Sequence, residues 1–340
     1  MINVSRNVGG IFFYRLTYLA NRKLCFLTLS ALVLSVSFAG CKPRTKNSQN
    51  SIKDANIMKH RMRSPLSEEY YSHQANWGGA CPSQLRQSPI KLDVSNTGSG
   101  GEKPIEFTYK SAEVTLVDAG HTLRGDIKGF GGAVTYDGKT YELKQFHFHT
   151  PSEHVFSDRE ASDMELHLVH KRKPDDAKDA DIAFVFGFLI RKDTTGSKFF
   201  NSVFDRFSSS PLLADEKDSK HGLTLGSESR PKFRSELDEG GLSLEGEVHH
   251  EKPLDGGPIT LDFSQLVPAK AKFYVYKGSL TTESCDEVVT HAVGLNELAI
   301  SPTQIESFSD YYGISKRELQ KPGSPNVRKY QLANSVKVSR

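Results

Sequence analysis

The chain has 340 residues, of which 37% are hydrophobic and 25% charged, so it can bury a core and has the composition of a globular protein. Of its 44 basic residues, four lie in the first 40 positions, which contain no acidic residue, and the remaining 40 are balanced by 41 acidic residues. This balance gives no electrostatic basis for binding nucleic acid, and we expect no such partner.

The first 40 residues have the pattern of an export signal, in which basic residues precede the apolar run 24–39. This run is shorter than the roughly 20 residues that a membrane span needs. It ends in small residues before Cys41, and the site resembles the lipobox of bacterial lipoproteins. We expect a signal peptide over residues 1–40, a lipid on Cys41 and a tether over 41–65. A plain cleaved signal peptide with an incidental cysteine is the alternative.

Export would place the protein in the periplasm or cell envelope, anchored to a bacterial membrane only through its lipid. Cys25 would then leave with the leader, and Cys41 would carry the lipid. Cys81 and Cys285 are the thiols that remain, and an oxidising compartment favours a disulfide between them. Two free thiols are the alternative.

Short runs of alternating apolar and polar residues, separated by Gly, Pro and Asn turns, predict a succession of β-strands. We expect strands over residues 105–110, 112–118, 121–127, 133–143, 145–150, 164–171, 181–190, 259–263 and 272–280. Asp137-Gly138 predicts a hairpin turn, and Ser197 is expected to cap an amphipathic helix over 197–207. Residues 208–258 are rich in Ser, Gly and charged residues and indicate a long surface insertion. Residues 66–340 are therefore predicted to form one β-rich domain.

The segment QFHFHT places two histidines two residues apart on a predicted strand. Alternation puts Gln145, His147 and His149 on one face of this strand and the two phenylalanines on the other. The segment MELHLVHK alternates in the same way, so that Glu165, His167 and Val169 share a face. If the two strands pair, three imidazoles converge with an open fourth position, which is typical of a catalytic zinc site. Gln145 and Glu165 are then suited to hydrogen-bond the ring nitrogens that face away from the metal.

A second interpretation of these residues is a cupin, whose H-x-H-x3-E pattern makes the glutamate a ligand and often takes iron or manganese. Cupins offer their last histidine within a second motif rich in Gly and Pro. Here His167 lies within a strand, directly beyond Glu165 and with no glycine near it. The zinc interpretation is therefore the stronger one.

At these residues the chain resembles an α-class carbonic anhydrase. The motifs RQSPI (86–90), AGHTL (119–123), QFHFH, SEH, ELHLVH, LVP (266–268), GSLTT (278–282) and NVRKYQ (326–331) occur in family order and span residues 77–331. The resemblance implies a mostly β fold, a single domain on a large, mainly antiparallel ten-stranded sheet with a few short peripheral helices. It implies Zn²⁺ as cofactor and reversible hydration of carbon dioxide to bicarbonate through zinc hydroxide as the reaction.

The resemblance also assigns roles to individual positions. It implies metal ligation by His147, His149 and His167, orientation of the hydroxide by Thr281 and Glu153, and proton relay by His121. It places Val169, Val185, Leu280 and Thr282 at the substrate pocket, and Gln145, Glu165 and the backbone carbonyl of Asn326 around the ligands. It pairs Cys81 with Cys285, and it matches Tyr71 to a pocket tyrosine.

Two departures from the family pattern bear on the pocket. Glu283-Ser284 replaces a Pro-Pro pair that often contains a cis bond, and because a cis bond between other residues costs about 2.5–4 kcal/mol we expect this one to be trans. His291 replaces a tryptophan of the pocket, so a polar ring is expected to weaken carbon dioxide binding or admit water. A non-catalytic binding module is the alternative function, since some relatives lose ligand histidines; all three are present here.

Overall fold

A computed structural model of the chain describes residues 65–83, 85–93, 103–172, 181–194, 196–213, 251–267, 271–320 and, for the backbone, 331–337. The proposed leader, Cys41, all of the tether except Pro65, Asn326 and most of the predicted insertion lie outside these residues. The ends of that insertion are described and are ordered: residues 211–213 form a 3₁₀ turn, and Lys252–Pro253 form strand β10.

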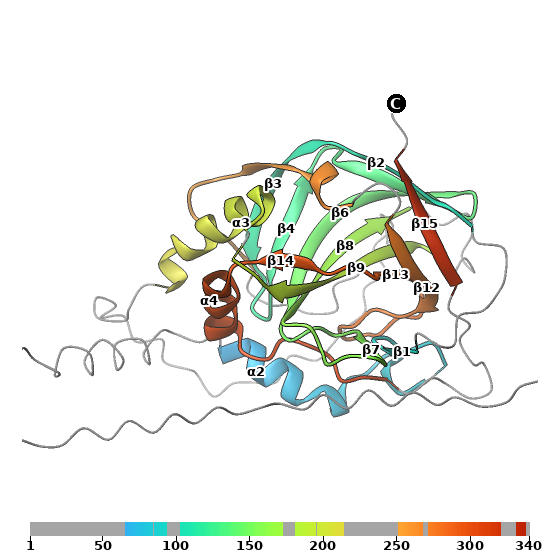
Figure 1. Cartoon of the computed structure of the whole chain (residues 1–340). Helices are drawn as coiled ribbons and strands as arrows, with labels where there is room; N and C mark the ends of the chain where they lie inside the picture. The colour runs from blue at the N-terminus through green and yellow to red at the C-terminus, as the bar shows by residue number, and fades with distance from the viewer. Residues whose placement is uncertain are drawn as a thin grey trace, which may run out of the picture. The chain divides into compact units, whose positions relative to one another are not determined.

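One mixed sheet dominates the described structure (Figure 1). Its strands are β2 (Ile105–Tyr109), β3 (Ser111–Asp118), β4 (Leu123–Lys128), β5 (Gly132–Tyr136), β6 (Lys139–His149), β8 (Met164–Lys171), β9 (Ala183–Lys192), β10, β11 (Ile259–Asp262), β12 (Lys272–Gly278), β13 (Val289–Gly294), β14 (Leu298–Ile300) and β15 (Gln331–Lys337). Two further short strands, β1 (Lys91–Leu92) and β7 (Val155–Phe156), pair with each other apart from it.

The sheet is larger than predicted, with 13 strands in the described residues instead of ten. Short strands such as β10 and β14, of two and three residues, are too brief to show the alternation that reveals a strand in a sequence. Most neighbours run antiparallel, as predicted, and the parallel contacts in this sheet are β13 with β9, β14 with β9, and β15 with β2. The predicted hairpin turn joins β5 to β6, where Asp137 and Gly138 both adopt positive φ.

In the described residues three α-helices accompany the sheet: α2 (Pro65–Ser72), α3 (Lys198–Ser208) and α4 (Pro302–Tyr312) (Figure 1). The predicted cap of α3 is confirmed, because the Ser197 side chain accepts a hydrogen bond from the Phe200 backbone N–H. Helix α4 begins with a capping box between Ser301 and Gln304. No helix in the described part of the chain is long and apolar enough to cross a membrane.

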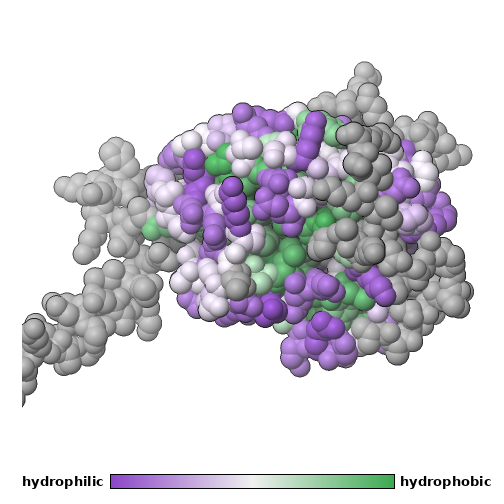
Figure 2. All heavy atoms as spheres, turned by 45° about the horizontal axis from the view of Figure 1, so that its top comes forward, coloured by the Kyte–Doolittle hydropathy of each residue, from purple (hydrophilic) through white to green (hydrophobic). Residues whose placement is uncertain are grey.

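The core lies on the face of the sheet that carries the phenylalanines of β6. Phe146 packs against Phe199 of α3, and Phe148 packs against Phe204 of α3 and Phe308 of α4. Burial of this face sets the register, since a slip of one residue would turn the phenylalanines outward. The alternate residues, His147 and His149, are therefore held on the opposite face. On the side of the molecule seen in Figure 2, apolar residues gather in the middle with hydrophilic residues beside them.

Candidate metal centre

Three histidines meet on the face of the sheet opposite the phenylalanine core. Strands β6 and β8 pair antiparallel, with His147 directly opposite His167 and His149 opposite Glu165. One ring nitrogen from each of His147, His149 and His167 lies within 4.8 Å of the other two. The pairing of two strands thus brings together the three imidazoles that the sequence singled out.

The ring nitrogens that face away from this cluster each have a hydrogen-bond acceptor. His147 Nδ1 donates to Gln145 Oε1 over 2.8 Å, and His167 Nε2 donates to Glu165 Oε1 over 2.8 Å. His149 Nδ1 donates to the backbone carbonyl of Ser315, also over 2.8 Å. These contacts select the tautomers and leave Nε2 of His147, Nε2 of His149 and Nδ1 of His167 as lone-pair donors.

The electrostatics of the cluster suit a cation. Burial lowers the pKa of His149 to about 4, and it lowers the pKa of His147 and of His167 below the ordinary value. Neutral imidazoles are the form that binds metal. The Nε2 atom of His149 is buried and has no hydrogen-bond partner among the described residues, so a metal ion would satisfy it. Three neutral nitrogens of this kind fit Zn²⁺ with a fourth position open.

Glu165 joins the cluster to a buried polar network that the sequence analysis missed. Its Oε1 accepts from His154 Nδ1 over 2.7 Å as well as from His167, and its Oε2 accepts from the His154 backbone N–H over 2.8 Å. Burial alone would raise the pKa of Glu165, but the neighbouring His154 and His167 hold it well below its usual value. His154 Nε2 lies 2.7 Å from Tyr276 Oη, which is 2.9 Å from Ser88 Oγ.

His154, Glu165 and His167 also lie close enough to one another to be considered as a metal site. Their nitrogens and oxygens are already hydrogen-bonded to one another. This second group therefore supports the three-histidine cluster and does not compete with it.

Glu153 is a fully buried carboxyl beside the cluster. Its Oε1 accepts from the Arg317 backbone N–H over 2.7 Å, and its Oε2 lies 3.5 Å from His149 Nε2. Burial raises the pKa of Glu153 to about 6, while His167, the Arg317 N–H and the Thr281 side chain oppose this rise. The predicted pair of Thr281 and Glu153 is thus brought together next to the histidines.

A cavity opens over the cluster, and it is lined by residues that were predicted to have catalytic or substrate-binding roles. They are His121, Val169, Val185, Leu280, Thr281, Thr282 and His291. Val169 and Val185 pair across β8 and β9, and Val185 pairs with His291 across β9 and β13, which makes one continuous wall. Arg124 and Glu251 also line the cavity and form an ion pair of 2.6 Å.

The tyrosine at this cavity is Tyr70 and not Tyr71, which corrects the prediction. Tyr70 lines the cavity, and its ring lies 4.8 Å from the His121 ring. Its hydroxyl accepts a hydrogen bond from the Glu283 backbone N–H over 2.9 Å. Both tyrosines are on helix α2 and their ring centroids lie 4.9 Å apart, so the helical pattern of the sequence does not show which of them lines the cavity.

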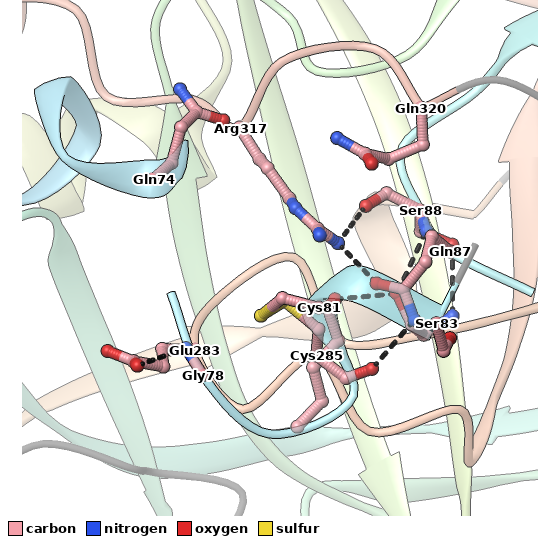
Figure 3. Close-up of a disulfide and its surroundings, with 12 residues drawn as sticks. Gln74, Gly78, Cys81, Ser83, Gln87, Ser88, Glu283, Cys285, Arg317 and Gln320 are labelled. Atoms are coloured by element: carbon pink, nitrogen blue, oxygen red, sulfur yellow. Dashed lines mark hydrogen bonds between the residues drawn. A yellow bond between two sulfur atoms is a disulfide. The ribbon is translucent and has the colours of Figure 1, made fainter. Parts of the chain in front are cut away.

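The loop after Thr282 also differs from the prediction, because the Glu283-Ser284 peptide bond is cis. We predicted a trans bond from the free-energy cost of a cis peptide bond alone, without the contacts that residues 78–80 make with this loop. The Gly78 N–H donates to Glu283 Oε1 over 2.7 Å (Figure 3), and the Ala80 N–H donates to the Ser284 carbonyl over 2.8 Å. The predicted disulfide between Cys81 and Cys285 is confirmed and joins the same two segments (Figure 3).

The carbonyl that orients a histidine of the cluster belongs to Ser315, whereas the sequence analysis assigned this role to Asn326. The assignment rested on the motif NVRKYQ (326–331), and the R-x-x-Q spacing within this motif also occurs at Arg317 and Gln320. The Arg317 side chain reaches the Gln87 side chain and the Ser88 carbonyl (Figure 3). Both segments have the R-x-x-Q spacing, and the sequence alone did not show which of them lies beside the histidines.

The fold and this cluster define a β-sheet protein with a three-histidine site. Comparison with known proteins shows which family has these features. The profile of the eukaryotic-type carbonic anhydrase family matches residues 72–223 and 247–340. The chain therefore belongs to this family.

Individual relatives agree with this assignment. A carbonic anhydrase of Nostoc sp. (strain PCC 7120 / SAG 25.82 / UTEX 2576) is 28% identical over 243 residues, which are 71% of this chain and 74% of the relative. Dioscorin DB3S of Dioscorea polystachya is 26% identical over 237 residues, or 68% and 71% of the two chains. A solved α-carbonic anhydrase of Thermovibrio ammonificans, in complex with the inhibitor sulfanilamide, has a TM-score of 0.53 and 25% identity, covering 74% of this chain and 89% of its own.

Proposed function

We propose that this protein is a zinc-dependent carbonic anhydrase, which hydrates carbon dioxide reversibly to bicarbonate and a proton. The observation that carries the proposal is the cluster of three imidazoles, each with its far nitrogen already held by Gln145, Glu165 or the Ser315 carbonyl. His147, His149 and His167 would hold the metal. Zinc bound there would lower the pKa of water from 15.7 to about 7 and so supply a nucleophile at neutral pH.

The protein's own residues would orient the reacting oxygen. Arg317 occupies one oxygen of Glu153 through its backbone N–H, and the other oxygen, which has no hydrogen-bond partner among the described residues, would accept the hydroxyl proton of Thr281. With its proton directed at Glu153, the Thr281 oxygen can only accept hydrogen bonds from the cavity. It would therefore select a protonated oxygen and turn the lone pair of that oxygen toward the substrate.

Two further parts of the cavity would complete the reaction. Val169, Val185 and Leu280 provide an apolar wall for carbon dioxide. His121 is half-buried in the cavity lining, with its ring against Tyr70, and its imidazole would pass the released proton to buffer. Imidazole is suited to proton transfer near neutral pH, because it can both accept and release a proton there.

The decisive experiment measures zinc content and carbon dioxide hydration on the purified protein. We expect one zinc per chain, hydration activity and inhibition by sulfanilamide. His167→Ala should lose zinc and activity, because two imidazoles hold the metal weakly. His170→Gln is the matched control, since His170 is on the same strand but contacts Tyr109 in the core. Full zinc occupancy in His167→Ala would contradict the assignment.

A non-catalytic binding module is the second candidate, because a matching relative bears the name dioscorin and not carbonic anhydrase. Zinc-loaded protein without hydration activity would support this candidate. The cupin interpretation is dropped, because the chain belongs to the carbonic anhydrase family.

We also propose that the protein is exported and held to a bacterial membrane by a lipid on Cys41. The sequence before residue 65 motivates this proposal, and a disulfide in the folded domain is in keeping with an oxidising compartment. Labelling with a fatty acid and membrane fractionation test it. Cys41→Ser should abolish the label and release the protein, and a labelled Cys41→Ser protein would contradict lipidation of this residue.

A further inference from the structure

Asp118 is a buried carboxylate at the end of β3, three residues before His121. Its Oδ1 accepts hydrogen bonds from the Gly120 backbone N–H and from Tyr312 Oη, each over 2.9 Å. Its Oδ2 accepts one from Tyr311 Oη, also over 2.9 Å. These bonds offset the cost of burying a charged group. Asp118 therefore joins the backbone before His121 to helix α4.

The loop between β3 and β4 forms part of the cavity lining, through Ala119, His121 and Thr122. The Ala119 N–H donates to the Thr122 carbonyl over 3.0 Å, which closes the loop. Gly120 has a φ of 79°, a conformation that residues with a side chain rarely adopt. The hydrogen bond from Gly120 to Asp118 holds the backbone in this conformation directly before His121.

The other end of the loop is attached to the strand that carries two of the clustered histidines. Thr122 Oγ1 donates to the Phe148 carbonyl over 2.5 Å, and the Phe148 N–H donates to Thr122 Oγ1 over 3.2 Å. Phe148 lies between His147 and His149 on β6. His121 therefore lies between two attachments, one to β6 at Thr122 and one to α4 through Asp118.

The two tyrosines that hold Asp118 are themselves packed in the core. Tyr312 stacks on Phe207 of α3 with an interplanar angle of 14°, and the Tyr311 ring lies 5.9 Å from the same phenylalanine. Burial, followed by the neighbouring Asp118, raises the pKa of both tyrosines. Both hydroxyls therefore keep their protons and donate to the carboxylate from fixed positions.

We propose that Asp118 is a positioning residue for proton transfer, which holds the loop so that the His121 ring faces the interior of the cavity. The proposal rests on the proposed carbonic anhydrase function. Asp118 is not among the residues that line the described cavity, so it would act through His121 and not on the substrate. Because transfer between two groups depends steeply on their placement, a loosened loop would slow release of the proton.

The test removes the two hydroxyls and keeps both rings. Tyr311→Phe combined with Tyr312→Phe is compared with wild-type protein at matched zinc content. In dilute buffer we expect carbon dioxide hydration to slow by about three- to tenfold. Concentrated imidazole buffer should restore the wild-type rate, because the buffer then takes the proton directly. The value of kcat/KM should change little, since it does not include the later proton transfer that regenerates the enzyme.

Tyr109→Phe is the matched control. It also removes a buried tyrosine hydroxyl, which lies 2.6 Å from His170 Nε2 in the core. This variant should keep the buffer dependence of the wild-type protein. If the double variant does not fold, Tyr312→Phe alone should show a smaller loss of the same kind, confined to dilute buffer.

A second comparison shows whether the tyrosines act through His121. In a His121→Ala protein, Tyr311→Phe and Tyr312→Phe should cause no further slowing in dilute buffer, because the group that they position is absent. A further loss in this background would overturn the proposal. An equal loss at every buffer concentration, or a lowered zinc affinity, would also overturn it. The latter would mean that the tyrosines act on His149 through Ser315.

The two proposals fail separately. Absent zinc or absent hydration in the wild-type protein defeats the proposed function. An active wild-type protein, together with tyrosine variants that keep its rate and its buffer dependence, defeats only the role of Asp118.

Discussion

Gly187 of β9 leaves the space that the Glu165 carboxylate occupies. A Cβ atom added at Gly187 would lie 2.6 Å from Glu165 Oε1, well inside contact distance. The carboxylate cannot move aside without losing its hydrogen bonds to His154 and His167. Gly187→Ala should therefore disturb the orientation of His167 and weaken zinc binding by about 10- to 100-fold, the effect usual for lost partners of metal ligands. Competition with a chelator of known affinity measures it.

Gly294→Ala provides the matched control for this substitution. Gly294 is on the neighbouring strand β13, and an added Cβ there would meet nothing closer than 3.5 Å, which is ordinary contact. This variant should keep its zinc affinity. If Gly187→Ala binds zinc as tightly as Gly294→Ala, the hydrogen bond between Glu165 and His167 does not contribute to the zinc affinity.

The buried Glu153 should make the metal-free protein less stable as the pH rises. Its pKa is raised to about 6 in the folded state from an ordinary value near 4.5, so between these values the folded state binds more protons than the unfolded state. Stability present below pH 4.5 is then lost as the pH rises through about 6, by about 2 kcal/mol in total. The free energy of unfolding is measured in urea for wild-type protein and Glu153→Gln, both without metal. The difference between the two free energies should change by this amount from pH 4.5 to 7.

The direction in which the difference in the free energy of unfolding changes with pH tests the raised pKa of Glu153. Glutamine cannot ionise, so Glu153→Gln should gain stability relative to the wild-type protein as the pH rises. A difference that stays constant with pH would show that Glu153 keeps an ordinary pKa in the folded protein.

The disulfide should stabilise the folded protein. Cys81 and Cys285 are 204 positions apart, and a link across so long a loop contributes about 2–5 kcal/mol. Cys81→Ser combined with Cys285→Ser should lower the free energy of unfolding by this amount in urea. Wild-type protein in excess reductant serves as the control and should behave like the double variant. Equal stability of the oxidised protein and the variant would contradict the prediction.

His121 should limit turnover only when buffer is scarce. His121→Ala should slow carbon dioxide hydration by at least about tenfold in dilute buffer, because proton transfer then lacks a nearby base. Zinc content should not change, and added imidazole buffer should restore the rate. A loss of the same size at every buffer concentration would assign His121 a structural role through its contact with Tyr70.

Alternation of side chains made much of this site predictable. The phenylalanines of β6 and the leucines of β8 had to face a core, which placed Gln145, His147 and Glu165 on the opposite face. The site residues that we did not predict come from segments in which apolar and polar side chains do not alternate. Ser315 and Arg317 follow helix α4 in an irregular stretch, and no local pattern indicates that it returns to His149 and Glu153. The contacts of Glu283 and Ser284 with Gly78 and Ala80 likewise join segments that are far apart in the sequence.

His149 depends for its orientation on a residue 166 positions later in the chain. Strands β6 and β8 are complete once residue 171 has been made, but the Nδ1 atom of His149 has no acceptor until Ser315 has followed. A chain that stops before Ser315 would possess all three imidazoles and still lack the group that points one of them at the ion. A chain that ends before Ser315 should therefore bind zinc more weakly than the full chain.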